Sequence, residues 1–347
     1  MAEQPSQGQE NGRKRSVMHV ENPGIPTSVD KIHNGDAALA LFDNLDDIHE
    51  GFEPGEEKKL VRKIDLIILP FLSVCYAFYY IDKTTLSYAA IFGIKEDLKL
   101  SGTQYSWLSS VFYFGFLVWS MPTNLLMQRF PIGKYLGVNI FLWGFFLMLQ
   151  AAAKNFTQLT VLRVISGAAE ACRLAIISRN LWPRIANIRP SDPAFMLITS
   201  MWYTRRQQPI RIGLWYTANG FGIAVGGLLG YGIGQIKGAL SSWKYEFLII
   251  GALCAAWGIV MIIFLPDSPV TARQLSGREK RLAVERLRDN QTGIENRTMK
   301  PRQILEAFLD WEVWTFFLLG FSGNIPNGGI SNFGTLIIKG FGFSTRA

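Results

Sequence analysis

The sequence has few of the residues on which enzymatic catalysis and metal binding usually depend. Its three histidines, His19, His33 and His49, all lie in the N-terminal segment, so none is available further along the chain. No phosphate-binding glycine loop, nucleophile elbow or cluster with metal-ligand spacing is present. We therefore expect no enzyme activity, no metal site and no cofactor.

Cysteine is also scarce. Cys75, Cys172 and Cys254 lie in or beside apolar runs and lack the spacing of a disulfide framework or a zinc site. We interpret them as small packing residues.

Acidic residues are fewer than basic ones, 27 against 35, which leaves a net charge of +8. Such an excess would suit a nucleic-acid partner, but it also marks the cytoplasmic ends of membrane helices. The apolar residues occur in long runs, which favours the second explanation. We expect a lipid bilayer as partner and no nucleic acid.

Apolar runs fill most of the chain after residue 57, and 49% of all residues are hydrophobic. A helix needs about 20 mainly apolar residues to cross a bilayer. The pattern predicts an all-α polytopic membrane protein. Its seven spans are predicted at residues 64–81, 105–127, 135–153, 157–203 (in two pieces), 213–234, 246–265 and 313–338.

The polar segments define the expected organisation. Residues 1–57 are predicted to be a disordered cytoplasmic tail, residues 58–266 a transmembrane bundle, and residues 267–310 a cytoplasmic loop with a surface helix near 276–293. Basic residues gather in the tail and in every second connection, which places the N-terminus in the cytoplasm if the fourth span crosses once.

The fourth span is interrupted. Residues 157–172 and 193–203 are each too short to cross a bilayer, although together they would be long enough. Residues 173–192 between them contain four arginines, which would cost on the order of 10 kcal/mol at the bilayer centre. This segment either leaves the membrane or does not belong to the working protein.

Four charged residues lie within the apolar runs. Asp82 and Lys83 either end the first span and face water, or pair and line a polar cavity. Arg163 and Glu170 are seven positions apart and share one face of a helix. They form either a structural interhelix ion pair or part of a site. In such a site Arg163 or Lys83 attracts an anionic solute, and Asp82 or Glu170 accepts a proton.

Three asparagines complete the candidate site. Asn219 lies in the glycine-rich fifth span, whose glycine face is predicted to pack closely on a neighbour. Asn324 and Asn327 belong to the run NIPNGG, which predicts a helix break within the membrane where backbone lines a cavity. All three are expected to hydrogen-bond substrate.

Four stretches together resemble a known family. They are DKTTLSYAAIFGIKEDLKLSGTQYSWLSSVFYFGFL, LRVISGAAEA, LPDSPVTARQLSGREKRLAVERLRDNQTG and SGNIPNGGISNFGTLIIKGFGFS. They resemble the major facilitator superfamily and, more narrowly, its fungal anion:cation symporter group, typified by allantoate permease. The fold implied is the N-terminal six-helix half of a major-facilitator fold plus a seventh span.

The resemblance implies proton-coupled uptake of a small organic anion across the plasma membrane by alternating access, in a monomer. Allantoate, a ureido acid, a small peptide and a vitamin-like acid all fit this class of solute. Arg163 and Glu170 occupy the positions of the Arg and Glu in the group's span-4 motif. Gln128 replaces the acid usual in the second-to-third connection, so a gating pair based on that acid is not expected.

Two departures from the family pattern affect this prediction. The span-4 Glu is normally followed about five residues later by a Pro, whereas Glu170 and Pro193 are 23 positions apart. Removing about 18 residues between them restores the spacing, which suggests that residues 173–192 are translated from a retained intron.

The family has twelve spans, whereas residues 311–347 hold the seventh span and a truncated second half. The alternatives are therefore a non-transporting truncated product or a seven-span receptor with an extracellular N-terminus.

Overall fold

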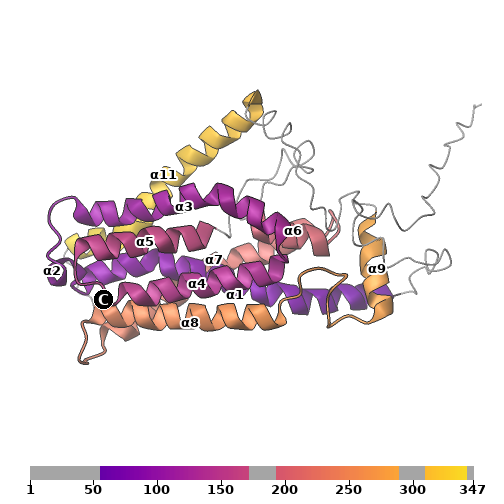
Figure 1. Cartoon of the computed structure of the whole chain (residues 1–347), viewed down its shortest axis with the longest axis horizontal. Helices are drawn as coiled ribbons and strands as arrows, with labels where there is room; N and C mark the ends of the chain where they lie inside the picture. Colours follow the sequence, from indigo (N-terminus) through magenta and orange to yellow (C-terminus); the bar gives the residue numbers. More distant parts are fainter. Residues whose placement is uncertain (1–54, 172–192, 289–308, 342–347) are drawn as a thin grey trace, which may run out of the picture. The chain divides into compact units, whose positions relative to one another are not determined.

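The structure is a computed structural model that describes residues 55–171, 193–288 and 309–341, and every regular element in these ranges is helical. The helices are α1 (Glu56–Ile91), α2 (Ile94–Asp97), α3 (Gln104–Arg129), α4 (Ile132–Gln150), α5 (Phe156–Ala171), α6 (Pro193–Trp202), α7 (Gln208–Gly234), α8 (Ser242–Phe264), α9 (Gly277–Arg288) and α11 (Trp311–Gly340) (Figure 1). The predicted all-α class is confirmed.

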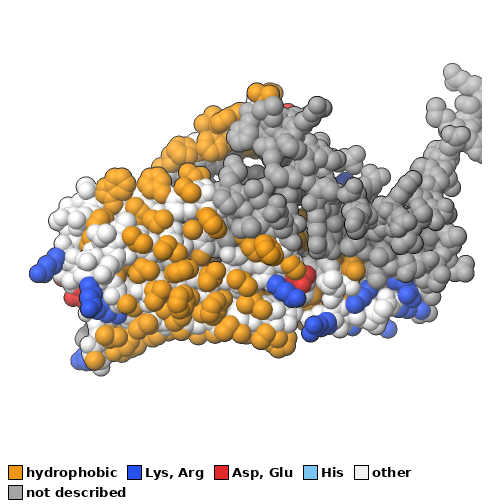
Figure 2. All heavy atoms as spheres, viewed as in Figure 1, with side chains coloured by type: hydrophobic (Ala, Val, Ile, Leu, Met, Phe, Trp, Pro, Cys, Tyr) orange, Lys and Arg blue, Asp and Glu red, His pale blue; other side chains and the backbone are white. Residues whose placement is uncertain are grey.

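Four of the described helices, α1, α4, α7 and α8, are long and apolar enough to cross a membrane. The predicted second and seventh spans correspond to α3 and α11, which have 26 and 30 residues. Apolar side chains cover much of the visible face of the described bundle (Figure 2). Leu66 on α1 and Leu228 on α7 are 77% and 73% exposed, as expected for side chains that face lipid.

Helices α4 and α8 lie side by side along a seam of glycines (Figure 1). A Cβ atom on Gly144 would meet the backbone of Gly251 and Ala255, and one on Gly258 would meet the backbone of Phe141. Small residues let membrane helices approach until their backbones touch, which strengthens van der Waals packing where no hydrophobic effect drives association.

The predicted close packing of the glycine-rich span is confirmed for α7. A Cβ on Gly222 would lie 2.6 Å from the carbonyl oxygen of Ala77 on α1. One turn or more further along, Gly226 and Gly230 face Ile81 and the Tyr88 ring of the same helix. The four-residue spacing therefore places one face of α7 directly against α1.

Helix α6 packs against the aromatic core of the bundle. The Phe195 ring lies 6.1 Å from that of Tyr76 on α1 and 5.5 Å from that of Trp215 on α7. Residues 172–192, which include Cys172 and the predicted interruption of the fourth span, lie outside the described residues. Residues 1–54 of the predicted tail (1–57) also lie outside the described residues, and its last two residues, Glu56 and Glu57, belong to α1.

The predicted break in the seventh span is wrong, because α11 continues through Pro326 to Gly340. Proline is tolerated in membrane helices when other groups satisfy the freed backbone. Ser322, Asn324 and Asn332 each donate a side-chain hydrogen bond to the carbonyl four residues earlier in α11, so these polar groups are satisfied within the helix. The NIPNGG run therefore lies within a helix.

The predicted helix of the central loop is present as α9, which packs near the start of α1 and the end of α6. Lys63 Nζ lies 2.7 Å from Glu279 Oε2, and Arg278 Nε lies 3.1 Å from Glu56 Oε1. Arg286 donates a 2.6 Å hydrogen bond to the Trp202 carbonyl. We refer to the two ion pairs, Lys63–Glu279 and Arg278–Glu56, as the α9 ion pairs.

Candidate functional site

Helix α1 carries Asp82 and Lys83 in its interior. The helix continues to Ile91 and both residues are half-buried, so they lie within the helix and not at its end. The Asp82 carboxylate accepts a hydrogen bond from Trp143 Nε1 of α4 at 3.2 Å. A buried tryptophan N–H thus holds this carboxylate against the neighbouring helix.

The Lys83 ammonium group lies over aromatic rings of its own helix. Its Nζ lies 5.0 Å from the centre of the Tyr79 ring and 5.3 Å from that of Tyr80, within the range of cation–π attraction. Consecutive residues on a helix diverge by about 100°. Asp82 and Lys83 therefore project in different directions, Asp82 toward Trp143 of α4 and Lys83 toward the Tyr79 and Tyr80 rings of its own helix.

Arg163 of α5 is buried, with 8% of its surface exposed. Its Nε donates to the Leu108 carbonyl at 2.9 Å, and Nη1 donates to Gln150 Oε1 at 3.4 Å. The guanidinium also lies 5.2 Å from the centre of the Phe112 ring. Groups from α3 and α4 thus hold the cation in one orientation.

Gln150 belongs to the same network, because its Nε2 donates to Ser166 Oγ at 2.9 Å. With the amide so oriented, its oxygen is the atom presented to Arg163. The sequence analysis did not single out Gln150. Its position at the end of the third predicted span concealed this role.

Glu170 is also buried, at 5% exposure, on the α5 face that carries Arg163. The negative charges of Asp82 and Glu170 both act on the Arg163 guanidinium, and all three charges act on the Tyr113 phenol of α3. We call Asp82, Tyr113, Arg163 and Glu170 the charged cluster. The structure thus brings together three of the four predicted charged residues.

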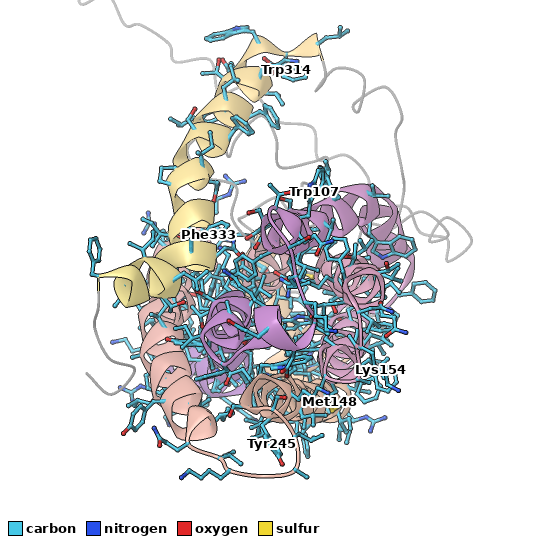
Figure 3. The ribbon with its side chains drawn as sticks, turned by 90° about the vertical axis from the view of Figure 1, so that its left-hand side faces the viewer. Trp107, Met148, Lys154, Tyr245, Trp314 and Phe333 are labelled. Atoms are coloured by element: carbon cyan, nitrogen blue, oxygen red, sulfur yellow. The ribbon has the colours of Figure 1, made fainter. Side chains whose placement is uncertain are left out.

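Helix α11 contributes Asn332, which the sequence analysis missed. Its side chain acts on the Tyr113 phenol, and its backbone carbonyl accepts a 3.0 Å bond from the Tyr105 hydroxyl. The neighbouring Phe333 lies against the bundle, whereas Trp314 near the start of α11 lies away from it (Figure 3). Asn332 lies in the same stretch, SGNIPNGGISNFG, as the predicted Asn327, and this proximity is the sequence signal that could have identified it.

The three predicted asparagines lie apart from these contacts. Asn219 is half-buried on α7, and Asn324 is exposed and donates to the Gly320 carbonyl of its own helix. Asn327 accepts a 3.2 Å bond from Ser331. Within the described residues, no recorded hydrogen bond joins any of the three to the charged cluster, and their predicted contact with substrate remains a prediction.

A buried acid, Glu246 of α8, was also missed. It is 0% exposed, and neither carboxylate oxygen has a hydrogen-bond partner among the described residues. The sequence pattern predicted that the sixth span begins at Glu246, which made this residue look like a boundary. The helix begins at Ser242, so Glu246 lies one turn inside it.

The chemistry available to the charged cluster is electrostatic. A fixed guanidinium attracts an anion, and a carboxylate beside it exchanges a proton as its surroundings change. No group of three metal-ligating side chains occurs in the part of the chain that the structure describes. The arrangement favours binding of an anion and a proton.

Comparison with known proteins identifies the family. A sequence model of the Major Facilitator Superfamily matches residues 72–181 and 189–347, more than half of the chain. An uncharacterized transporter of Schizosaccharomyces pombe is 44% identical over 89% of this chain and 54% of its own length. Allantoate permease of Saccharomyces cerevisiae is 36% identical over 90% of this chain and 55% of its own length.

Among solved structures, a bacterial homolog of the human lysosomal transporter Spinster, in an inward-facing and unoccupied conformation, is similar with a TM-score of 0.47 and 17% identity. This similarity covers 63% of this chain and 45% of that one.

The apolar helices and the family match together define an integral membrane protein. The chain belongs to the major facilitator superfamily, and the predicted resemblance to its fungal transporters is confirmed. The chain spans about half the length of the curated relatives it matches. The gap in the family match, residues 182–188, falls inside the predicted interruption of the fourth span.

Proposed function

We propose that this protein takes part in proton-coupled uptake of a small organic anion at the plasma membrane, with its N-terminus in the cytoplasm. The observation that carries the proposal is the buried Arg163, held by α3 and α4 and acted on by the carboxylates of Asp82 and Glu170. Charges inside a membrane protein are costly, and they commonly mark substrate or proton pathways.

Arg163 supplies the attraction for the anion in this proposal. An anion that approaches the guanidinium competes with Asp82 and Glu170 for the same positive charge. Protonation of either carboxylate removes that competition, so proton binding strengthens anion binding, and the reverse follows by reciprocity. Such coupling is what a symporter needs in order to move both ligands in the same direction.

The class of solute is supported by the similarity to allantoate permease. We take allantoate as the first test solute, with a ureido acid, a small peptide and a vitamin-like acid as further members of the class. The receptor alternative has lost its support, because the named relatives are transporters or permeases.

The test measures uptake of radiolabelled allantoate in cells or vesicles with an acidic exterior, with and without a protonophore. Arg163→Gln is compared with Arg278→Gln, which removes an exposed arginine from the α9 ion pairs. We expect uptake that the protonophore abolishes, that Arg163→Gln loses and that Arg278→Gln keeps. Uptake insensitive to the protonophore would refute coupling, and equal activity of both variants would refute the site.

A non-transporting product is the second candidate, because the chain spans about half the length of its relatives. We distinguish the two by expressing the chain alone and together with the C-terminal half of the Schizosaccharomyces pombe relative. Uptake by the chain alone supports the first proposal, and uptake only with the second half supports a partner-dependent protein. No uptake in either case, with the chain present in the membrane, supports the non-transporting product.

We also propose that residues 173–192 derive from a retained intron, a hypothesis supported by the spacing of Glu170 and Pro193; the family match omits residues 182–188 of this segment. Full-length sequencing of the native transcript tests it. A major message without these codons supports the proposal, and a message that always contains them refutes it.

A further inference from the structure

Glu246 is a buried acid that the proposed anion site does not use. It lies on the face of α8 that also carries Trp243, Phe247 and Ile250, all of them at most 2% exposed. Helix α8 packs against α1, α4 and α7. The surroundings of the carboxyl group are therefore mainly apolar and closed to solvent.

No charge compensates Glu246 in the described part of the chain. Both carboxylate oxygens lack a hydrogen-bond partner there. Burial is the influence found to act on the Glu246 carboxyl group, and no charged group of α1, α4 or α7 is found to act on it. The ionisable group that Glu246 itself acts on is the Tyr88 phenol of α1. Tyr88 in turn packs against Gly227 and Gly230 of α7.

An isolated carboxylate in such a place would have to give up its hydration without compensation. That cost is so large that buried acids become neutral instead of remaining charged. A neutral carboxyl group needs only ordinary polar contacts, and it gains an O–H donor that a carboxylate lacks. The environment therefore accommodates the protonated form of Glu246.

We propose that Glu246 is a proton-binding site, separate from the charged cluster, which holds a proton in the closed packing of α1, α7 and α8. The binding step forms one O–H bond between a carboxylate oxygen and a proton taken from solvent, and no other bond changes. Proton release requires the contact of α8 with α1 to loosen enough for water to reach the carboxyl group.

This site would add a second protonation event to the coupling, and in that respect the inference rests on the proposed symport. Proton binding itself is independent of transport. It can therefore be tested in purified protein, whatever the solute proves to be.

The experiment is infrared difference spectroscopy on the purified full chain at neutral pH, which detects the carbonyl stretch of protonated carboxyl groups. We compare the wild type with Glu246→Gln and, as a matched control, Glu96→Gln, which changes an exposed acid of α2. We expect Glu246→Gln to lose one protonated-carboxyl band and Glu96→Gln to keep it. An unchanged spectrum in Glu246→Gln overturns the proposal.

A second variant covers the case in which Glu246→Gln does not fold. Tyr88→Phe keeps the carboxyl group and removes a neighbouring hydroxyl, so it should shift the frequency of the same band without abolishing it. A spectrum identical to wild type in this variant counts against the site.

Uptake measured on the same preparations separates the two proposals. Loss of the band without any proton-driven uptake leaves the site intact and refutes the symport. Proton-driven uptake together with an unchanged band in Glu246→Gln supports the symport and refutes the site at Glu246.

Discussion

The charged cluster and the α9 ion pairs contain the same kinds of side chain in different surroundings. In the α9 ion pairs, the Lys63 side chain is 42% exposed and that of Arg278 is 44% exposed. In the charged cluster, Arg163 and Glu170 are 8% and 5% exposed. Water screens the exposed α9 ion pairs, whereas Arg163 and Glu170 are largely shielded from it, so the same kinds of charge differ greatly in energetic weight.

This difference shows where charge has a functional use. Exposed pairs adjust how two elements dock and add little stability. Buried charges bring a desolvation cost that a purely structural role would avoid through apolar substitution. The presence of a buried arginine and a buried glutamate, Arg163 and Glu170, in the charged cluster therefore favours a role in ligand binding.

The largest expected effect follows from Arg163→Ala. The substitution leaves the Gln150 amide and the nearby carboxylates without their cation, and removal of one partner from a buried charged network typically costs about 3–5 kcal/mol. Unfolding of purified protein in a denaturing detergent series measures the loss. A cost below about 1 kcal/mol would mean that the charged cluster is as weakly coupled as an exposed pair.

A smaller effect is expected from Trp143→Phe, which removes the N–H donor to Asp82 and keeps an aromatic ring. Hydrogen bonds to charged groups contribute about 1.5–3 kcal/mol. The matched control is Trp257→Phe, because the Trp257 Nε1 has no hydrogen-bond partner in the described residues. The same unfolding series should show a greater loss for Trp143→Phe, and equal losses would assign the effect to ring size.

A pH-dependent effect is expected at Asp97, outside the spans. The hydrogen bond from the Ser241 hydroxyl, and then the 2.7 Å bond from Trp243 Nε1, hold the pKa of Asp97 below its ordinary value. A carboxyl group with a lowered folded-state pKa stabilises the fold above its unfolded pKa, and this contribution is lost as pH falls through the folded value.

Asp97→Asn should therefore flatten the acid limb of the stability curve at a pH below about 4. Melting temperatures measured across that range test this, with Glu96→Gln as the control. A parallel acid limb in Asp97→Asn and the wild type would contradict it.

The smallest effect is expected from Lys63→Ala, which removes one of the α9 ion pairs. Partial burial of Glu279 acts to raise its pKa, but the hydrogen bonds from Lys63 and Ser276 lower the pKa overall. Exposed pairs contribute about 0.2–1 kcal/mol. Unfolding at low and high salt measures the loss, which should disappear at high salt; a salt-independent loss near that of Arg163→Ala would remove the contrast.

The sequence allowed four membrane-length helices (α1, α4, α7 and α8), the central-loop helix and the common face of Arg163 and Glu170 to be predicted, because each depends on periodicity or composition along one helix. Contacts between helices were harder to predict. Trp143 and Asn332 lie on different helices from the groups they bind, and spacing along the chain does not encode that proximity.

Two errors share another cause. The NIPNGG run looked like a break because proline and glycine disfavour helices in water, but α11 continues through it. Glu246 looked like a span boundary because charge usually marks one. In both cases the usual preference of one residue type, proline for a helix break and glutamate for a span boundary, did not decide the local structure.

The glycine seam between α4 and α8 has a mechanical consequence. Since no Cβ fits at Gly144 or Gly258 without displacing the facing backbone, an alanine at either position would push α4 and α8 apart. We therefore expect this pair of helices to move as one unit, and larger changes of shape to occur in helices with looser partners such as α11, whose outer half is exposed.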